Sequence, residues 1–139
     1  MGARSAFSDP MDDADLIRQL AERWNARDID GAVVLYADDA VVVNGADWPE
    51  QGSWEGHGEI RRSMEEWVAV WESSVVEMGP IERYGDRILA RGTWRNRGMT
   101  SGVEGSMPFS ILFSFRDGKI VLHEWFTDHD AALAAVRGS

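Results

Sequence analysis

The sequence predicts an α+β fold, in which a curved, mostly antiparallel sheet wraps around N-terminal helices and encloses an internal pocket. In the first half of the chain, hydrophobic residues recur every three to four positions, whereas from residue 74 onward they largely alternate with polar residues. These two periods are typical of helices and strands, respectively. Two hairpin signals, Gly85-Asp86 and Asp117-Gly118, separate the long strand-like runs. Because strands twist, a sheet of this length is expected to curl around the helices and leave a cavity at its open end.

The helical pattern is clearest in the segment Glu59–Glu72. Its apolar residues form one stripe: Ile60, Met64, Trp67, Val68 and Trp71. Further helices are expected at Asp12–Arg27, at Ile29–Tyr36 with Asp28 as its cap, and at His129–Val136. Strands are expected at Ala40–Val43, Ser74–Tyr84, Arg87–Arg97, Glu104–Arg116 and Lys119–Thr127, with a bulge at Gly79-Pro80. Residues 1–11 are expected to form a flexible tail, and residues 12–136 a single domain.

Charge and composition exclude several classes of function. The chain has 139 residues and a formal net charge of −10, which disfavours nucleic acids and anionic membrane surfaces as partners. It has no cysteine, no spacing typical of a metal site, and no glycine-rich phosphate-binding motif. We therefore expect no metal and no cofactor. No apolar run is long enough for a membrane helix and no signal peptide is recognisable, which favours a cytoplasmic protein.

The seven tryptophans indicate either a heavy core or an aromatic-lined cavity. Trp48 and Trp54 lie in a glycine-rich segment, Gly45–Gly58, and loops with such residues often cover pockets. Trp67 and Trp71 belong to the stripe of Glu59–Glu72, where a core role is the simpler interpretation.

Strand alternation predicts which side chains face the cavity. Met107, Phe109, Ile111, Phe113 and Phe115 share one face of their strand, and Ile88, Ala90, Gly92, Trp94 and Asn96 share one face of the strand before it. The small residues Ala90 and Gly92 are expected to leave room. In the last strand, one face carries Val121, His123, Trp125 and Thr127. The other carries Ile120, Leu122, Glu124 and Phe126, and this face is also largely apolar, which suggests a homodimer formed through the outer sheet face.

Several local strings, in this order, resemble the SnoaL-like branch of the nuclear-transport-factor-2-like superfamily. They are Trp24-Asn25-Ala26-Arg27-Asp28, Leu35-Tyr36-Ala37-Asp38-Asp39-Ala40, Gly56-His57-Gly58-Glu59-Ile60, Ser101-Gly102-Val103-Glu104, Phe115-Arg116-Asp117-Gly118-Lys119-Ile120 and Asp128-His129-Asp130-Ala131-Ala132-Leu133. The resemblance covers residues 12–136. It implies a cystatin-like α+β barrel with a deep pocket, usually dimeric, and it places the His123 face inside; the reverse facing of this strand is the alternative. Members include polyketide cyclases, ketosteroid isomerases, dehydratases and non-enzymes, so the fold alone does not identify a function.

Three polar residues are candidates for catalysis. His123, among aromatic residues, is expected to be partly desolvated and neutral, and it could act as a general base; a buried structural histidine is the alternative. Asp128 is either a helix cap or an acid/base near the pocket rim. Asn44 could orient a ligand carbonyl or a water.

The same resemblance argues against steroid isomerisation. It places Asn44 where ketosteroid isomerases have their general-base aspartate, and Leu20 and Ile111 where they have the two oxyanion donors. Asparagine cannot accept a proton at a useful pH, and leucine and isoleucine cannot donate a hydrogen bond.

The sequence therefore predicts a pocket protein for a flat, hydrophobic small molecule of polyketide or terpenoid type. It could catalyse a cofactor-free cyclisation, isomerisation or dehydration; the alternative is a non-catalytic binding or dimerisation domain. The expected wall residues are Trp48, Trp54, Trp67, Trp94, Met107, Phe109, Ile111 and Trp125.

Overall fold

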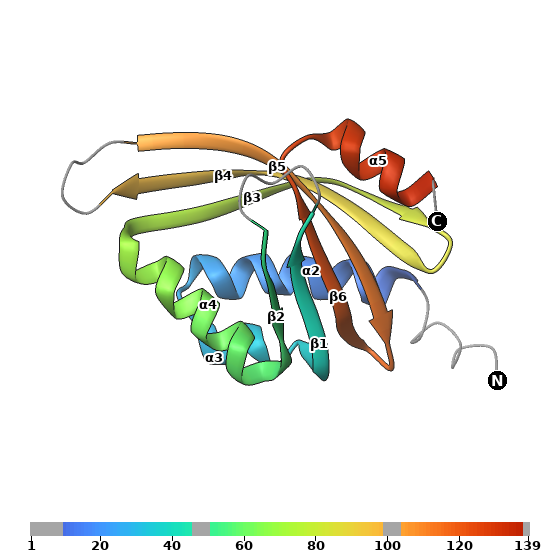
Figure 1. Cartoon of the computed structure of the whole chain (residues 1–139), viewed down its shortest axis with the longest axis horizontal. Coiled ribbons are helices and arrows are strands. Elements are labelled where there is room, and N and C mark those ends of the chain that lie inside the picture. The colour runs from blue at the N-terminus through green and yellow to red at the C-terminus, as the bar shows by residue number, and fades with distance from the viewer. Residues whose placement is uncertain (1–9, 46–50, 99–103, 138–139) are drawn as a thin grey trace.

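The computed structural model describes residues 10–45, 51–98 and 104–137. Three helices, α2 (Pro10–Asn25), α3 (Ile29–Val33) and α4 (Gly56–Val70), lie below a curved sheet, and α5 (His129–Arg137) lies on its opposite face (Figure 1). The strands are β1 (Tyr36–Asn44), β2 (Ser53–Glu55), β3 (Trp71–Tyr84), β4 (Arg87–Gly98), β5 (Glu104–Arg116) and β6 (Lys119–Phe126). The sheet order is β2-β1-β6-β5-β4-β3, and every neighbouring pair is antiparallel except β1 and β6. The predicted α+β fold is confirmed.

The helices follow the predicted positions with shifted ends. α2 begins at Pro10, two residues earlier than expected, so residues 10 and 11 of the predicted tail are helical. The rest of the predicted tail, residues 1–9, lies outside the described residues. The Asp28 side chain caps α3 by accepting a hydrogen bond from the backbone N–H of Gly31 at 2.9 Å. α3 then ends at Val33, and Tyr36 begins β1 instead of ending the helix.

Both predicted hairpin turns are confirmed. Tyr84 pairs with Arg87, and Arg116 pairs with Lys119, which leaves two-residue turns at Gly85-Asp86 and Asp117-Gly118. Asp117 and Gly118 both have positive φ angles, 52° and 75°, as a two-residue turn with the twist of its strands requires.

Two of the register shifts in the sheet bear on the predicted facing of its side chains. The register of β3 and β4 shifts between Met78 and Ile81, which confirms the bulge predicted at Gly79-Pro80. A second shift lies between Ser114 and Phe115, where β5 pairs with β6. Because of it, Ile120 belongs to the same buried cluster as Tyr36 and Phe113, although strict alternation had placed Ile120 on the face opposite His123.

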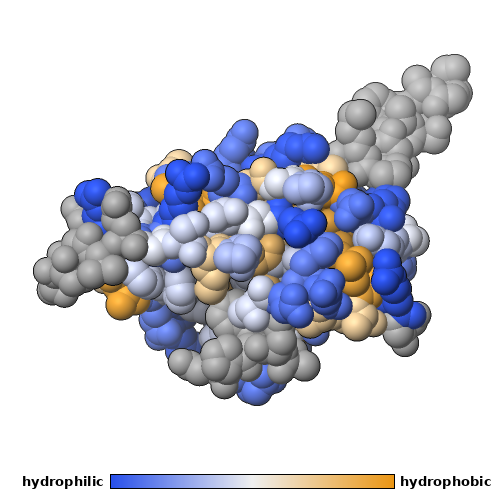
Figure 2. All heavy atoms as spheres, turned by 90° about the horizontal axis from the view of Figure 1, so that it is seen from above, coloured by the Kyte–Doolittle hydropathy of each residue, from blue (hydrophilic) through white to orange (hydrophobic). Residues whose placement is uncertain are grey.

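The outer face of the sheet carries a smaller core under α5. Leu89, Leu112 and Phe126 pack there against Ala132 and Val136 of the helix. These outward apolar residues are therefore covered by the chain itself. Seen from above, hydrophobic residues form small areas among hydrophilic ones (Figure 2). The homodimer through this face stays a prediction.

Gly92 does not leave room in the cavity as expected. A Cβ atom at this position would lie 2.7 Å from Cζ of Phe109 and 2.8 Å from the carbonyl oxygen of Glu77. The Phe109 ring therefore occupies the space next to Gly92, and a side chain there would displace it.

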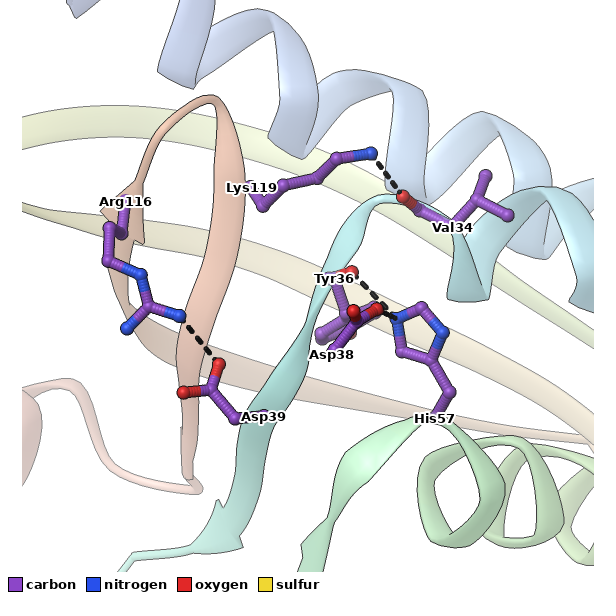
Figure 3. A network of polar contacts seen from close by, with 7 residues as sticks. All are labelled: Val34, Tyr36, Asp38, Asp39, His57, Arg116 and Lys119. Atoms are coloured by element: carbon purple, nitrogen blue, oxygen red, sulfur yellow. Dashed lines mark hydrogen bonds and ion pairs between the residues drawn. The ribbon is translucent and has the colours of Figure 1, made fainter.

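Polar contacts hold the start of β1 in place (Figure 3). His57, in the first turn of α4, donates a hydrogen bond to the Tyr36 carbonyl at 2.7 Å. Lys119 donates to the Val34 carbonyl at 2.8 Å, and Arg116 contacts Asp39 at 2.6 Å. The backbone of Tyr36 is thus fixed between α4 and the β5–β6 hairpin.

The end of α2 is fastened to the edge strand β3. The Asn25 side chain donates to the Val76 carbonyl at 2.9 Å and accepts from the Val76 N–H at 2.8 Å. This pair of bonds satisfies backbone groups of an edge strand and fixes the position of Trp24, the residue before Asn25.

Candidate functional site

A cavity of about 440 Å³ lies between the concave face of the sheet and the helices α2 and α4. Its volume is within the range of small-molecule sites. The lining residues are predominantly apolar: Ile17, Leu20, Ala21, Trp24, Tyr36, Val42, Asn44, Trp54, Ile60, Ser63, Met64, Glu66, Trp67, Val70, Val76, Met78, Trp94, Phe109, Ile111, Phe113, His123 and Trp125. Glu66 and Val70 are exposed, so the cavity opens to solvent on the side of α4.

Strand register places the sheet side chains of the cavity wall in rows. His123 pairs with Val42 on one side and Phe113 on the other. Trp125, two residues further along β6, pairs with Asn44 and Ile111. The parallel pairing of β1 with β6 therefore brings both predicted polar residues, His123 and Asn44, to one wall.

Indole rings form another part of the wall. Trp94 stacks on Trp125 with ring centroids 5.1 Å apart and on Trp67 at 4.5 Å. The indole N–H groups of Trp67 and Trp94 both donate to the Ser74 hydroxyl, at 3.2 and 2.8 Å, and that hydroxyl donates to Asn96 Oδ1 at 2.7 Å. Ser74 therefore fixes the orientation of two rings and satisfies their buried donors.

His123 and Tyr36 form a buried polar pair at the inner end of the cavity. The Tyr36 hydroxyl lies 2.8 Å from His123 Nδ1, and the two residues are 2% and 4% exposed. Phe113 and Trp125 pack around the imidazole, at centroid distances of 4.8 and 4.6 Å.

This apolar environment keeps both partners uncharged. Burial lowers the pKa of His123 to about 3 and raises the pKa of Tyr36 well above its usual value. At neutral pH the pair is therefore a phenol hydrogen-bonded to a neutral imidazole.

Hydrogen-bond accounting assigns the tautomer of His123. Nδ1 is the hydrogen-bond partner of the Tyr36 hydroxyl. A bond from Nδ1–H to the phenol oxygen would leave the buried phenol O–H without an acceptor, so the arrangement with fewer unpaired groups has the phenol O–H donating to Nδ1. The ring proton is then on Nε2. That nitrogen is buried and has no hydrogen-bond partner among the described residues. His123, which is one of the residues that line the cavity, is thus a neutral imidazole with an unused Nε2–H donor.

The described lining residues include no lysine or arginine, and Glu66 at the mouth is the one carboxylate among them. Within the described ranges, no group of three or more His, Asp or Glu side chains is placed to hold a metal ion. Apart from Glu66 at its mouth, the described part of the site is therefore uncharged.

None of the described helices is long and apolar enough to cross a membrane.

The structure brings most of the candidate site residues to this cavity. His123, Asn44, Trp54, Trp67, Trp94, Phe109, Ile111 and Trp125 all line it. Met107 pairs with Trp94 and packs against the core without lining the cavity. Trp48 lies outside the described residues.

Asp128 is on the other side of the sheet. It lines a separate depression together with Ser110 and His129, which are joined by a hydrogen bond of 2.8 Å. Its carbonyl accepts from the N–H of Ala132 at 3.2 Å and its carboxylate from the N–H of Asp130 at 3.3 Å. These contacts are those of the helix cap that the sequence offered as one of two alternatives.

Sequence reasoning missed Tyr36 and Trp24 as site residues. The sequence pattern places Tyr36 at the end of the expected helix Ile29–Tyr36 and Trp24 within the expected helix Asp12–Arg27. A signal was available in both cases, because a buried tyrosine or tryptophan needs a partner for its polar group. The sequence does not show that the partner of Tyr36 is 87 residues away.

Residues 17–123 match the family model of the SnoaL-like domain. No curated protein matches the chain significantly.

Solved structures show the same fold at low sequence identity. A protein with a ketosteroid isomerase-like fold from Catenulispora acidiphila, solved in complex with trimethylamine, is 18% identical with a TM-score of 0.73, covering 86% of this chain and 89% of that one. TerC, co-crystallised with polyporic acid, is 20% identical with a TM-score of 0.73, covering 91% and 98%. An NTF2-like protein of unknown function from Burkholderia pseudomallei is 19% identical with a TM-score of 0.74, covering 92% and 98%. Because the family model spans residues 17–123, more than half of the chain, the chain belongs to the SnoaL-like domain family.

Proposed function

We propose that the protein binds a flat, neutral, largely apolar small molecule that carries a carbonyl oxygen, and that the Nε2–H of His123 donates a hydrogen bond to that oxygen. The observation that carries this proposal is the buried Nε2 atom, which has no partner among the described residues. A buried donor without an acceptor costs about 1–3 kcal/mol, and a ligand oxygen would recover that energy.

The remaining wall supports this ligand class. Stacked indoles offer large flat apolar surfaces, and the described lining residues contain no cation to balance a ligand carboxylate. The Glu66 carboxylate at the mouth and the net charge of −10 disfavour anions further. Polyporic acid bound to TerC is a ligand of that protein, and it motivates testing oxygen-bearing aromatic compounds here.

Three probes of nearly equal shape test the proposal: 2-acetonaphthone, 2-ethylnaphthalene and 2-naphthoate. We expect the ketone to bind about tenfold more tightly than the hydrocarbon, because it accepts the His123 hydrogen bond, and the carboxylate to bind least. Quenching of tryptophan fluorescence and titration calorimetry measure the affinities.

His123→Leu is the matching variant, because leucine is similar in size and has no donor. It is expected to reduce ketone affinity to that of the hydrocarbon and to leave hydrocarbon affinity nearly unchanged. Equal affinity of the wild-type protein for ketone and hydrocarbon, or no binding of either, would refute the proposal.

Cofactor-free proton-transfer catalysis is a second candidate, favoured by the same Nε2–H donor. A neutral imidazole that donates to a carbonyl oxygen also stabilises an enolate developing there. The base is harder to supply, because burial holds the pKa of His123 near 3 and Asn44 is not basic. Exchange of the ketone's α-protons with solvent deuterium, faster with the wild-type protein than with His123→Leu, would favour catalysis over binding alone.

A further inference from the structure

A second unused donor belongs to another residue that lines the same cavity, Trp24. Nε1 of Trp24 is buried and has no hydrogen-bond partner among the described residues, a property it shares with His123 Nε2. The indoles of Trp67 and Trp94 differ, because both donate to Ser74. Trp24 lines the cavity from α2, across from the sheet that carries His123.

The position of Trp24 is well fixed. The next residue, Asn25, makes two hydrogen bonds with the backbone of Val76, and the Trp24 ring meets the Trp94 ring edge to face at 6.3 Å and 71°. A donor held in place and left unsatisfied is costly, and a ligand acceptor that reaches it once neighbouring side chains shift would recover that cost.

We propose that Trp24 is a specificity-determining residue, whose Nε1–H binds a second acceptor oxygen of the ligand while His123 Nε2–H binds the first. This inference rests on the proposed function and narrows its ligand class to flat, neutral molecules with two acceptor oxygens on separate parts of an aromatic skeleton. Binding such molecules satisfies both orphaned donors at once.

Two pairs of probes test it over short and long oxygen spacings: 1,4-naphthoquinone against α-tetralone, and 2,6-diacetylnaphthalene against 2-acetonaphthone. Each pair compares two oxygens with one on a similar skeleton, and the chain has no cysteine to react with the quinone. At least one two-oxygen probe is expected to bind the wild-type protein about tenfold more tightly than its counterpart.

Trp24→Phe removes the N–H and keeps an aromatic ring. It is expected to abolish that tenfold preference while the wild-type preference for 2-acetonaphthone over 2-ethylnaphthalene survives. Trp67→Phe is the matched control, because its N–H already bonds Ser74; it is expected to weaken all probes alike and to keep the preference.

An independent readout uses the wild-type protein. Its seven tryptophans give indole N–H signals in a ¹H–¹⁵N spectrum, and that of Trp24 is expected to move strongly downfield with the preferred two-oxygen probe. This readout tests whether the Trp24 N–H binds a ligand oxygen even when Trp24→Phe does not fold. The Trp24 signal is assigned through its contacts with the Trp94 ring.

Two results would overturn the inference. One is a two-oxygen preference that is absent from both probe pairs or unchanged in Trp24→Phe. The other is a Trp24 indole signal that stays at a high-field position with every probe, which would show that its N–H is directed at the Trp94 ring. In either case a retained preference for ketone over hydrocarbon leaves the proposed function standing, whereas loss of that preference in the wild-type protein removes both.

Discussion

Replacing His123 by leucine is expected to lower the free energy of unfolding, because it leaves the buried Tyr36 hydroxyl without its acceptor at a cost of about 1–3 kcal/mol, which removal of the unpartnered Nε2–H offsets in part. Tyr36→Phe is expected to destabilise by a similar amount, since it leaves Nδ1 of His123 unpaired. The double variant removes both polar groups and is expected to be more stable than the sum of the single effects by about 1–2 kcal/mol. Urea denaturation followed by circular dichroism measures all four proteins.

Tyr84→Phe provides the control for this cycle. Tyr84 is the other tyrosine of the chain, it is half-buried, and its hydroxyl makes no hydrogen bond to the described residues. Its replacement is expected to change stability by less than about 0.5 kcal/mol. Strictly additive effects of Tyr36→Phe and His123→Leu would show that the two side chains do not interact.

The stability of the wild-type protein is expected to fall between about pH 6.5 and pH 3 because of His123. Burial lowers the pKa of His123 to about 3 in the folded state, from its ordinary value near 6.5 in the unfolded chain. In this window the unfolded state binds a proton that the folded state does not, so acidification favours unfolding; above pH 6.5 both states are neutral and the contribution is constant. One pKa unit corresponds to 1.36 kcal/mol, so the loss at pH 5 is about 2 kcal/mol.

Comparison with His123→Leu isolates this contribution. Other groups also respond to acid, among them Glu124, which is half-buried on the outer sheet face and has a pKa that burial raises although Arg87 lowers it. Their contributions are common to both proteins, so the difference in slope between the wild type and the variant reports on His123. Parallel pH profiles would contradict a buried, neutral imidazole.

How far the sequence predicts the fold depends on the range of the interactions involved. The stripe of α4 and the turns Gly85-Asp86 and Asp117-Gly118 are local features, and the structure has them where the pattern places them. The exception is Trp71, which the pattern places in the helical stripe but which begins β3, because α4 ends at Val70. β2 lies within the glycine-rich segment and is only three residues long. A strand of that length is too short for an alternating pattern to be recognised in the sequence. The facing of Ile120 was also not predictable from alternation, because a register shift where its strand pairs with β5 places Ile120 in the inner core.

The site was predictable in its composition but not in its connections. Alternation and the resemblance together placed His123, Trp125 and Ile111 on the concave face, and the cavity contains them. The pairing of His123 with Tyr36 depends on the parallel register of β1 with β6, which is long-range and leaves no local pattern. The lack of partners for Trp24 Nε1 and His123 Nε2 likewise cannot be predicted from the sequence, because it depends on the positions of all neighbouring acceptors in the folded structure.

The histidine region of a ¹H–¹⁵N NMR spectrum tests the central claim most directly, with the His123 signals identified by their absence in His123→Leu. At pH 6 the account predicts a neutral ring protonated on Nε2, with Nδ1 as the acceptor, and a downfield shift of the Nε2 proton when 2-acetonaphthone is added. A charged imidazole, or a ring protonated on Nδ1 that does not respond to the ketone, would contradict it.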